Sequence, residues 1–389
     1  MGPLNPSLAG PPTLVLCLGE ALVDRLLPVG FDPAVVDRNA ASACTPEVGL
    51  GLPANVNSAA GRPSGGVDRL GGAPANVACG LARLGTPAAL AGRLGSDAIG
   101  AAFAALFAER GVDTTALQWD PSRPSRIVLV RRDRTGERSF AGFLGDRGAG
   151  FADQALDATD LRKAAAPLLA EARWLLTGTL VLASPAAAAA LEGLLDSLPA
   201  VESGEVDRHP GHRPALAVDL NWRPTFWGLA PASAPPAAIQ ARIRPLLERA
   251  ALIKCAAEEA RWFFGTEDPL AIGAALPGRP GVCVTDGAAP LRWSLGGRSG
   301  QLEPLAIEAV DTTGAGDAFM AGLLHGLCQA GQGSGLGSDP EALVRFAAAC
   351  GSLVCRGAGA IDPQPTSNEV ECFLAQSSAA RLSPRGLKG

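Results

Sequence analysis

The chain of 389 residues has few of the side chains on which many catalytic centres depend. Only three histidines are present, His209, His212 and His325, so a Ser-His-Asp triad or a histidine-ligated metal site has few parts to work with. Two of them form "HPGH" in a Pro/Gly-rich segment, which favours a solvated loop over a metal clip. The nine cysteines never stand as C-x-x-C and mostly lie in apolar segments, so we interpret them as reduced packing residues.

The chain also lacks a strong net charge and long apolar runs. The net charge is only -5, and no run of Lys and Arg stands out, which argues against nucleic acid or an acidic membrane surface as a partner. The first apolar run is interrupted by Gly19 and Glu20, follows no basic segment, and is too short to cross a bilayer. We therefore expect a cytoplasmic protein with a small-molecule partner, and neither nucleic acid nor a membrane.

Two common nucleotide-binding signatures are also absent. The chain has no G-x-x-x-x-G-K-[ST] segment, which excludes a P-loop protein, and no G-x-G-x-x-G follows its first predicted strand, as a dinucleotide site requires. With 47% hydrophobic and 18% charged residues, the composition suits one large α/β domain or two modest ones.

What the chain does have is an alternation of short apolar runs with helical stretches. The predicted buried strands are 13–19, 87–95, 172–178, 215–221, 251–255 and 281–287. The predicted helices between them include 97–111, 184–198 and 237–250. This alternation predicts a mainly parallel sheet with helices on both faces, whose ligands bind beyond the carboxyl ends of the strands.

One part of the chain departs from that alternation. Residues 125–133 and 137–143 are strand-like runs without a helix between them, and they predict a hairpin. Together with 22–29 they could form a small separate β-layer. Residues 39–68 and 199–214 are rich in Gly, Pro, Ala and polar residues without periodicity, so we expect surface insertions there.

The segment "VDTTGAGDAFMAGLL" (310–324) places a carboxylate at a glycine-rich turn. Apolar residues recur at helical spacing after Asp317, so Gly314, Ala315 and Gly316 lie between a strand and a helix, and their N–H groups suit an anion. A carboxylate beside bound phosphate repels it, and one reason to keep it there is to take a proton from an attacking hydroxyl. From this segment alone, a helix-capping aspartate is an equal alternative.

A second glycine-rich segment lies far upstream, "RLGGAPANVACGLARLGTPAALAGRLGSDAIG" (69–100). Paired with 310–324, it closely resembles the two signatures of the ribokinase-like, PfkB-type carbohydrate kinases. Two further segments follow in that family's order, "DLNWRPTFW" (219–227) and "GAGAIDPQPT" (357–366). The start "GEALVD" and the segment "LNWRPTFW" look most like those of fructokinases.

The resemblance covers residues 13–374 as one kinase domain, with flexible termini at 1–12 and 375–389. It implies a three-layer α/β/α fold with a mainly parallel central sheet and a small β-sheet lid. The lid strands would come from about 22–37 and 119–145. A surface hairpin is the plainer interpretation of the same strands, and pairing of two lids leaves a homodimer open.

The resemblance also implies roles for individual residues. Asp317 would be the base that deprotonates a primary sugar hydroxyl for attack on the γ-phosphate of ATP, with Gly314, Ala315 and Gly316 as the anion hole. The residues that would contact the sugar are Asp24, Gly71, Gly72 and Asn76. A carboxylate and an amide supply the donors and acceptors that sugar hydroxyls need, although Asp24 alone could be a solvated strand end.

The nucleotide end is expected to take ATP with Mg²⁺, and potassium remains open. The residues that would bind the nucleotide or its phosphates are Asp219, Asn221, Arg223, Thr285, Gly287, Gly357 and Gly359. Glu259 would act on Mg²⁺ through water, because Ala256 stands where many relatives have Asn, and an ordinary acid of a first helical turn is the alternative. Asp311 and Thr313 match positions around a monovalent-cation site in several relatives.

Two departures concern the nucleotide, Pro290 in place of a frequent glycine and Ala348 in place of an Asn near adenine. The function that this sequence favours is an ATP-dependent sugar kinase, with fructose phosphorylated at its 6-hydroxyl as the first hypothesis. The alternatives are a kinase for another sugar, a ketodeoxysugar acid or a nucleoside, and a non-catalytic relative that binds sugar or nucleotide.

Overall fold

The computed structural model describes residues 13–27, 67–132, 138–196, 214–330 and 339–382. The predicted insertions lie almost wholly outside these ranges, as do the "HPGH" histidines, Cys44, the first terminus and residues 28–37 of the expected lid. Among the described residues, no helix is both long and apolar enough to cross a lipid bilayer.

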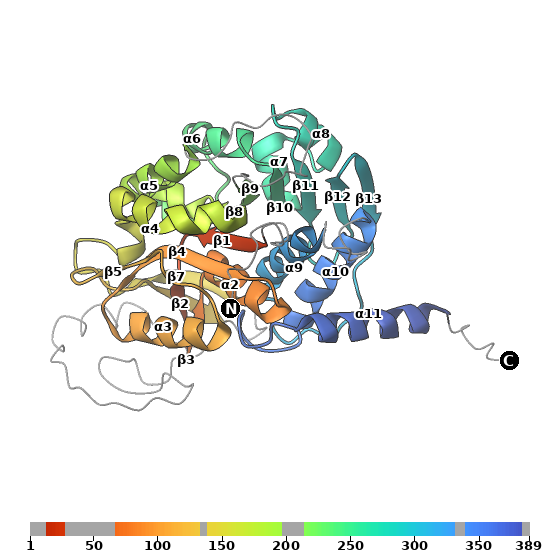
Figure 1. The fold of residues 1–389 in the computed structure, drawn as a ribbon, viewed down its shortest axis with the longest axis horizontal. Helices are drawn as coiled ribbons and strands as arrows, with labels where there is room; N and C mark the ends of the chain where they lie inside the picture. Colours follow the sequence, from red (N-terminus) through yellow and green to blue (C-terminus); the bar gives the residue numbers. More distant parts are fainter. Residues whose placement is uncertain (1–12, 28–66, 133–137, 197–213, 331–338, 383–389) are drawn as a thin grey trace, which may run out of the picture.

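A nine-stranded sheet forms the centre of the molecule, in the order β13-β12-β11-β10-β9-β8-β1-β4-β5 (Figure 1). Its strands are β1 Leu14–Leu18, β4 Ala88–Gly95, β5 Leu117–Asp120, β8 Ala172–Gly178, β9 Ala215–Asp219, β10 Leu252–Ala256, β11 Gly281–Thr285, β12 Leu291–Leu295 and β13 Arg298–Leu302. The strands from β11 through β5 pair in parallel, which confirms the predicted mainly parallel sheet. The antiparallel pair β12 and β13 at one edge was not predicted.

A second sheet of four strands lies apart from the first, in the order β3-β2-β6-β7. The strands are β2 Leu22–Leu27, β3 Val67–Gly71, β6 Ile127–Arg132 and β7 Arg138–Leu144. β6 and β7 are the predicted hairpin, and β2 pairs in parallel with β6. β3 takes up the last two residues of the segment that was expected to be an insertion.

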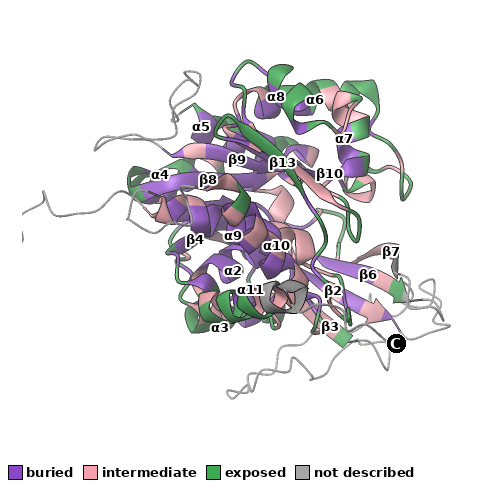
Figure 2. Ribbon diagram, turned by 90° about the vertical axis from the view of Figure 1, so that its right-hand side faces the viewer, coloured by how far each residue is buried: buried purple, intermediate pink, exposed green. Residues whose placement is uncertain are grey.

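Helices cover both faces of the large sheet and complete three layers (Figure 1). One hydrophobic cluster packs α2 Ala73–Leu84, α3 Ala98–Arg110, α9 Ala315–Gln329 and α10 Pro340–Val354 against one face. A second cluster packs α4 Ala158–Glu171, α5 Pro185–Leu195, α6 Ala237–Glu248, α7 Ala257–Phe264 and α8 Pro269–Ala274 against the other. The purple interior in Figure 2 follows the strands and the inner sides of these helices.

The last helix, α11 Ser367–Leu382, packs against α10 and extends beyond residue 374, where the kinase domain was expected to end. Within the described ranges, short 3-10 helices occur in connections: η3 Ala152–Gln154, η4 Leu180–Ala183 and η5 Pro224–Trp227. The last of them follows the carboxyl end of β9 and begins directly after Arg223, a residue of the site described next.

Candidate active site

The two glycine-rich segments meet in space although 241 residues separate their polar side chains. Asn76 on α2 donates a hydrogen bond from Nδ2 to Oδ2 of Asp317 on α9, at 2.7 Å. The two helices lie against each other over the same face of the large sheet. The carboxylate of the second segment is therefore held by the amide of the first.

The turn before Asp317 has the backbone of an anion site. Gly314 caps α9 with φ +80°, and a β-carbon there would lie 2.5 Å from Cβ of Ala360, so both the conformation and the space require glycine. The first helical hydrogen bond runs from the Ala318 N–H to the Gly314 carbonyl at 2.8 Å. The N–H groups of Gly316 and Asp317 precede that bond, at the positive end of the helix dipole.

Desolvation raises the pKa of the Asp317 carboxyl to about 6, and the charge of Asp219 adds to the effect. The hydrogen bond from Asn76 and the charges of Lys254 and Arg223 oppose it. The result is a carboxylate that is ionised near neutral pH and more basic than an ordinary aspartate, which is what a general base requires.

The expected sugar-contacting residues surround one small space. A β-carbon built on Gly71 would lie 3.8 Å from both Oδ2 of Asp24 and Oδ1 of Asn76. That Asn76 oxygen is buried and accepts no hydrogen bond from the described residues. Gly72, at φ +103°, lies so close to the Glu20 carbonyl that a β-carbon would come within 2.5 Å of it. The segment thus places the unpartnered Asn76 oxygen and the Asp24 carboxylate beside a backbone that has no side chain.

Lys254 is a member of the site that the sequence interpretation missed. From inside β10 its Nζ donates to both Asp219 oxygens at 3.1 Å, and it lies 2.6 Å from where a β-carbon on Gly316 would be. Burial alone lowers the pKa of Lys254, but Asp219, Glu259 and Asp317 outweigh it and raise the pKa. Gly316 is therefore small so that an ammonium group can lie directly behind the anion-binding turn.

Glu259, the predicted partner of Mg²⁺ through water, has both carboxylate oxygens engaged by backbone. Oε1 accepts from the Trp222 N–H at 2.6 Å and Oε2 from the Ala256 N–H at 2.8 Å. Burial raises the pKa of this carboxyl. The contacts favour the alternative of a first-turn acid, here one that ties the loop after β9 to the start of α7.

The remaining phosphate-end residues gather at the carboxyl ends of neighbouring strands. Asp219 ends β9, Asn221 follows it with φ +42°, and Arg223 is exposed and close enough to lower the pKa of Asp317. Thr285 ends β11, two residues before Gly287. This is the edge at which ligands bind in parallel sheets.

Asp311 organises the loop on the other side of the turn. Its Oδ1 accepts from the N–H and the hydroxyl of Thr313, and its Oδ2 accepts from the Gly359 N–H at 3.0 Å. A β-carbon built on Gly357 would lie 2.5 Å from Cβ of Pro363, so this position has room only for glycine. These contacts join the C-terminal loop to the glycine-rich turn, and the monovalent-cation role of Asp311 and Thr313 stays a prediction.

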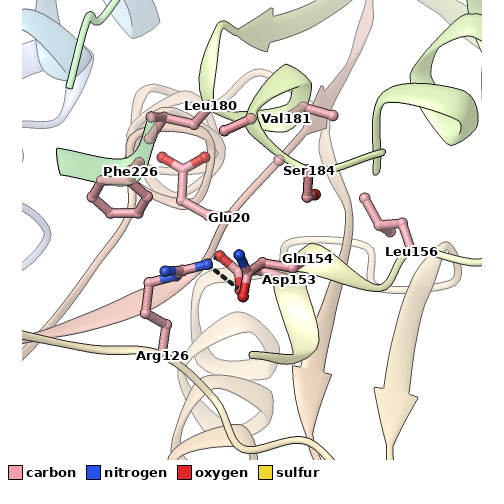
Figure 3. Close-up of a pocket in the computed structure, with 11 residues that line it drawn as sticks. Glu20, Arg126, Asp153, Gln154, Leu156, Leu180, Val181, Ser184 and Phe226 are labelled. Carbon is pink, nitrogen blue, oxygen red and sulfur yellow. Dashed lines mark hydrogen bonds and ion pairs between the residues drawn. The ribbon is translucent and has the colours of Figure 1, made fainter. Parts of the chain in front are cut away.

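Glu20 and Arg126 were also missed, and both line a small cavity of about 20 Å³ (Figure 3). Glu20 follows β1 and accepts from the Ala73 N–H at the start of α2, at 3.2 Å. Desolvation raises the pKa of Glu20 to about 7, with the charges of Asp153 and Asp317 adding to it. A charged residue at the end of an apolar strand gives no local sign in the sequence that it belongs to a site, because its partners come from distant segments.

The site fits Mg²⁺ that arrives with a nucleotide better than a metal held by the protein alone. The described residues contain no cluster of three or more His, Cys, Asp or Glu side chains suited to a metal ion. Asp219 and Glu259 already use their oxygens on Lys254 and on backbone N–H groups. Phosphate oxygens and water would then supply most ligands, as is usual for Mg²⁺ bound with nucleotides.

Comparison with known proteins agrees with this geometry. Residues 52–367 match the model of the pfkB family carbohydrate kinases. A fructokinase of Escherichia coli is 32% identical over 308 residues, which cover 77% of this chain and 90% of that relative.

Two solved structures cover nearly the whole chain. The fructokinase of Xylella fastidiosa with bound ATP superposes with a TM-score of 0.68 at 25% identity, over 94% of this chain and 99% of its own. The fructokinase of Vibrio cholerae with fructose, ADP and a calcium ion gives a TM-score of 0.67 at 25% identity, over 93% and 99%. The similarity thus extends through both sheets and is not limited to the two glycine-rich segments.

Proposed function

The chain belongs to the pfkB family of carbohydrate kinases, and from that premise we propose that it transfers the γ-phosphate of ATP to the 6-hydroxyl of fructose. Membership makes it a phosphotransferase that acts on an alcohol group. The finer proposal rests on one observation above all, the 2.7 Å hydrogen bond between Asn76 and Asp317, which joins the sugar end and the phosphate end of one site.

In the proposed reaction, Asp317 takes the proton from the 6-hydroxyl as its oxygen attacks the γ-phosphorus. The bond between that phosphorus and the oxygen bridging to the β-phosphate breaks, and ADP leaves with the electron pair. The N–H groups of Gly316 and Asp317 would bind the equatorial phosphoryl oxygens as charge develops on them, because the Ala315 N–H already donates to the Thr312 carbonyl. Lys254 would add positive charge behind the turn. The proton then passes from Asp317 to solvent.

The sugar would be held by Asp24, by Asn76 and by the exposed backbone of Gly71 and Gly72. Asn76 would accept from a sugar hydroxyl at its Oδ1 while its Nδ2 keeps Asp317 in place. This double use suits an amide, which both donates and accepts. Because the reacting groups are prepositioned, much of the entropy cost of the encounter is removed before the chemical step.

ATP with Mg²⁺ is the proposed phosphate donor, and the ion would shield the charge between the β- and γ-phosphates. Arg223, Thr285 and Gly287 lie at the strand ends where the phosphates would lie. The ATP in the Xylella fastidiosa structure and the fructose and ADP in the Vibrio cholerae structure support both ligands for this chain. The four-stranded sheet would act as a lid that excludes water from the reacting groups.

A panel of sugars tests the substrate. The purified protein is incubated with Mg-ATP and fructose, other hexoses, ribose, a ketodeoxysugar acid or a nucleoside, and ADP release is followed. We expect the highest kcat/KM for fructose. A higher value for another compound would replace the substrate, and the absence of acceptor-dependent ADP release, under conditions where an Escherichia coli fructokinase is active, would overturn the proposal.

A further inference from the structure

A buried arginine connects the four-stranded sheet to the large domain. Arg126, immediately before β6, is 5% exposed and makes a two-point ion pair with Asp153 of η3, with Nε to Oδ2 at 2.8 Å and Nη2 to Oδ1 at 3.0 Å. Figure 3 shows this pair among the side chains that line the small cavity, with Glu20 and Phe226 above it. A two-point pair of this kind fixes the relative orientation of its two side chains, and loss of either partner leaves the other charge buried and unpaired.

Three aromatic rings surround the same guanidinium. Its central carbon lies 5.0 Å from the ring centre of Phe143, 4.4 Å from that of Phe151 and 4.9 Å from that of Phe226. These distances are within the range of cation–π attraction. Phe143 and Phe226 also meet edge to face, with centres 5.0 Å apart. Because Phe143 belongs to β7 and Phe226 to η5, the cluster joins the small sheet to a loop of the large domain.

Each side of the cluster leads directly to one end of the proposed active site. On the small sheet, the Arg126 carbonyl accepts from the Val23 N–H at 3.0 Å, and the next residue of that strand is Asp24. On the large domain, Phe226 shares a single tight turn with Arg223, whose carbonyl accepts from the Phe226 N–H at 3.1 Å. The positive charge of Arg223 in turn lowers the pKa of Asp317.

We propose that Arg126, Asp153, Phe143, Phe151 and Phe226 form a latch that couples the sugar end of the site to the phosphate end. When sugar holds β2 and the small sheet in place, Arg126 and Phe143 seat Phe226, and the turn of η5 then presents Arg223 to the phosphates. Phe226 is thus a positioning residue that acts through Arg223. This inference rests on the proposed function and adds the route by which one substrate prepares the site for the other.

The latch predicts that sugar and nucleotide bind cooperatively. In the wild-type protein, fructose should lower the Kd of a non-hydrolysable ATP analogue, by a factor within the roughly 5- to 150-fold range usual for coupled sites. In Phe226→Ala that factor should fall to nearly one, while the Kd of fructose measured alone changes little. The sugar-independent fraction of ADP release should rise in the same variant.

Phe140→Ala is the matched control. Phe140 lies on the same strand as Phe143 and packs against it with centres 4.9 Å apart, but it is not one of the three rings around Arg126. It should keep the cooperativity of the wild-type protein. Phe226→Leu retains much of the buried volume and is the control for folding. It shows whether a loss of cooperativity in Phe226→Ala comes only from a poorly folded protein. Cooperativity that persists in a folded Phe226→Ala protein would overturn the latch.

Hydrogen exchange tests the latch without any substrate and so separates it from the proposed function. Arg126→Met/Asp153→Asn removes both charges of the ion pair together, so that neither is left unpaired. We expect faster exchange at the amides of Phe226, Gly228 and Leu229, which are hydrogen-bonded within the η5 turn. Unchanged exchange there would contradict the coupling even if the protein is an active kinase. Faster exchange would support the latch even if the favoured sugar is not fructose.

Discussion

Asp317 is the residue on which the proposed chemistry depends, and its environment predicts the pH dependence of the reaction. Since desolvation and Asp219 raise its pKa to about 6, the ionised base is lost as the pH falls through that value. We expect kcat/KM for fructose to rise with pH to a plateau above an acid limb near pH 6. An acid limb near pH 4, the value of an ordinary aspartate, would contradict the environment described for this carboxyl.

The same pKa shift predicts that Asp317 costs stability at neutral pH. A carboxyl whose pKa is higher in the folded than in the unfolded protein stabilises the fold below the unfolded pKa, and this contribution is lost as the pH rises through the folded pKa. Asp317→Asn should therefore raise the free energy of unfolding at pH 7 to 8 by up to about 3 kcal/mol. In urea unfolding series, the advantage should disappear below about pH 4; a variant less stable than wild type at pH 8 would contradict it.

Lys254 should hold the pKa of Asp317 down, because its ammonium group favours the charged carboxylate. In Lys254→Met/Asp219→Asn, which leaves no unpaired buried charge, turnover should fall. In Asp219→Asn alone, the acid limb of the pH profile should move to lower pH. The double variant should have an acid limb above that of Asp219→Asn. Lys163→Met, at an exposed position on α4, is the control and should match wild type. Coinciding limbs for the two variants would exclude Lys254 from this role.

At the scale of elements, the start of α9 depends on a glycine for which no other residue can substitute. Gly314→Ala places a side chain at φ +80° and within 2.5 Å of Ala360, so we expect a loss of about 1 to 3 kcal/mol in unfolding free energy and a weaker Kd for ATP. Gly193→Ala is the matched control, because a β-carbon at this position inside α5 meets nothing within 4 Å. It should stabilise the protein by about 0.5 to 1 kcal/mol. Equal thermal stability of the two variants would contradict this account of the turn.

The elements also show how far sequence alone reaches. The strand and helix alternation was predictable because buried parallel strands are short apolar runs, and the meeting of 69–100 with 310–324 followed from the family resemblance. β3 was missed because it begins in a segment with no periodicity. Lys254 and Arg126 were missed because a single charge in or beside a strand gives no local sign of its partner, and those partners come from β9, η3, β7 and η5.

At the scale of the whole molecule, the two sheets divide the work of the proposed reaction. The large parallel sheet brings Asp219, Lys254 and the start of α9 together for the phosphates, and the small sheet contributes Asp24 for the sugar. Asn76 stands between them on α2 and is bonded to Asp317. A sugar kinase requires this arrangement, because the hydroxyl and the γ-phosphate must meet at one base.

The most direct test of the central claim compares wild type with Asp317→Asn in the phosphorylation of fructose by Mg-ATP, followed by phosphorus NMR. We expect wild type to form fructose 6-phosphate and the variant to do so roughly 10²-fold more slowly or worse, the usual scale for the loss of a general base. Calorimetry should show that the variant still binds fructose and ATP. Formation of the product at similar rates by both proteins, or no product from wild type, would contradict the account.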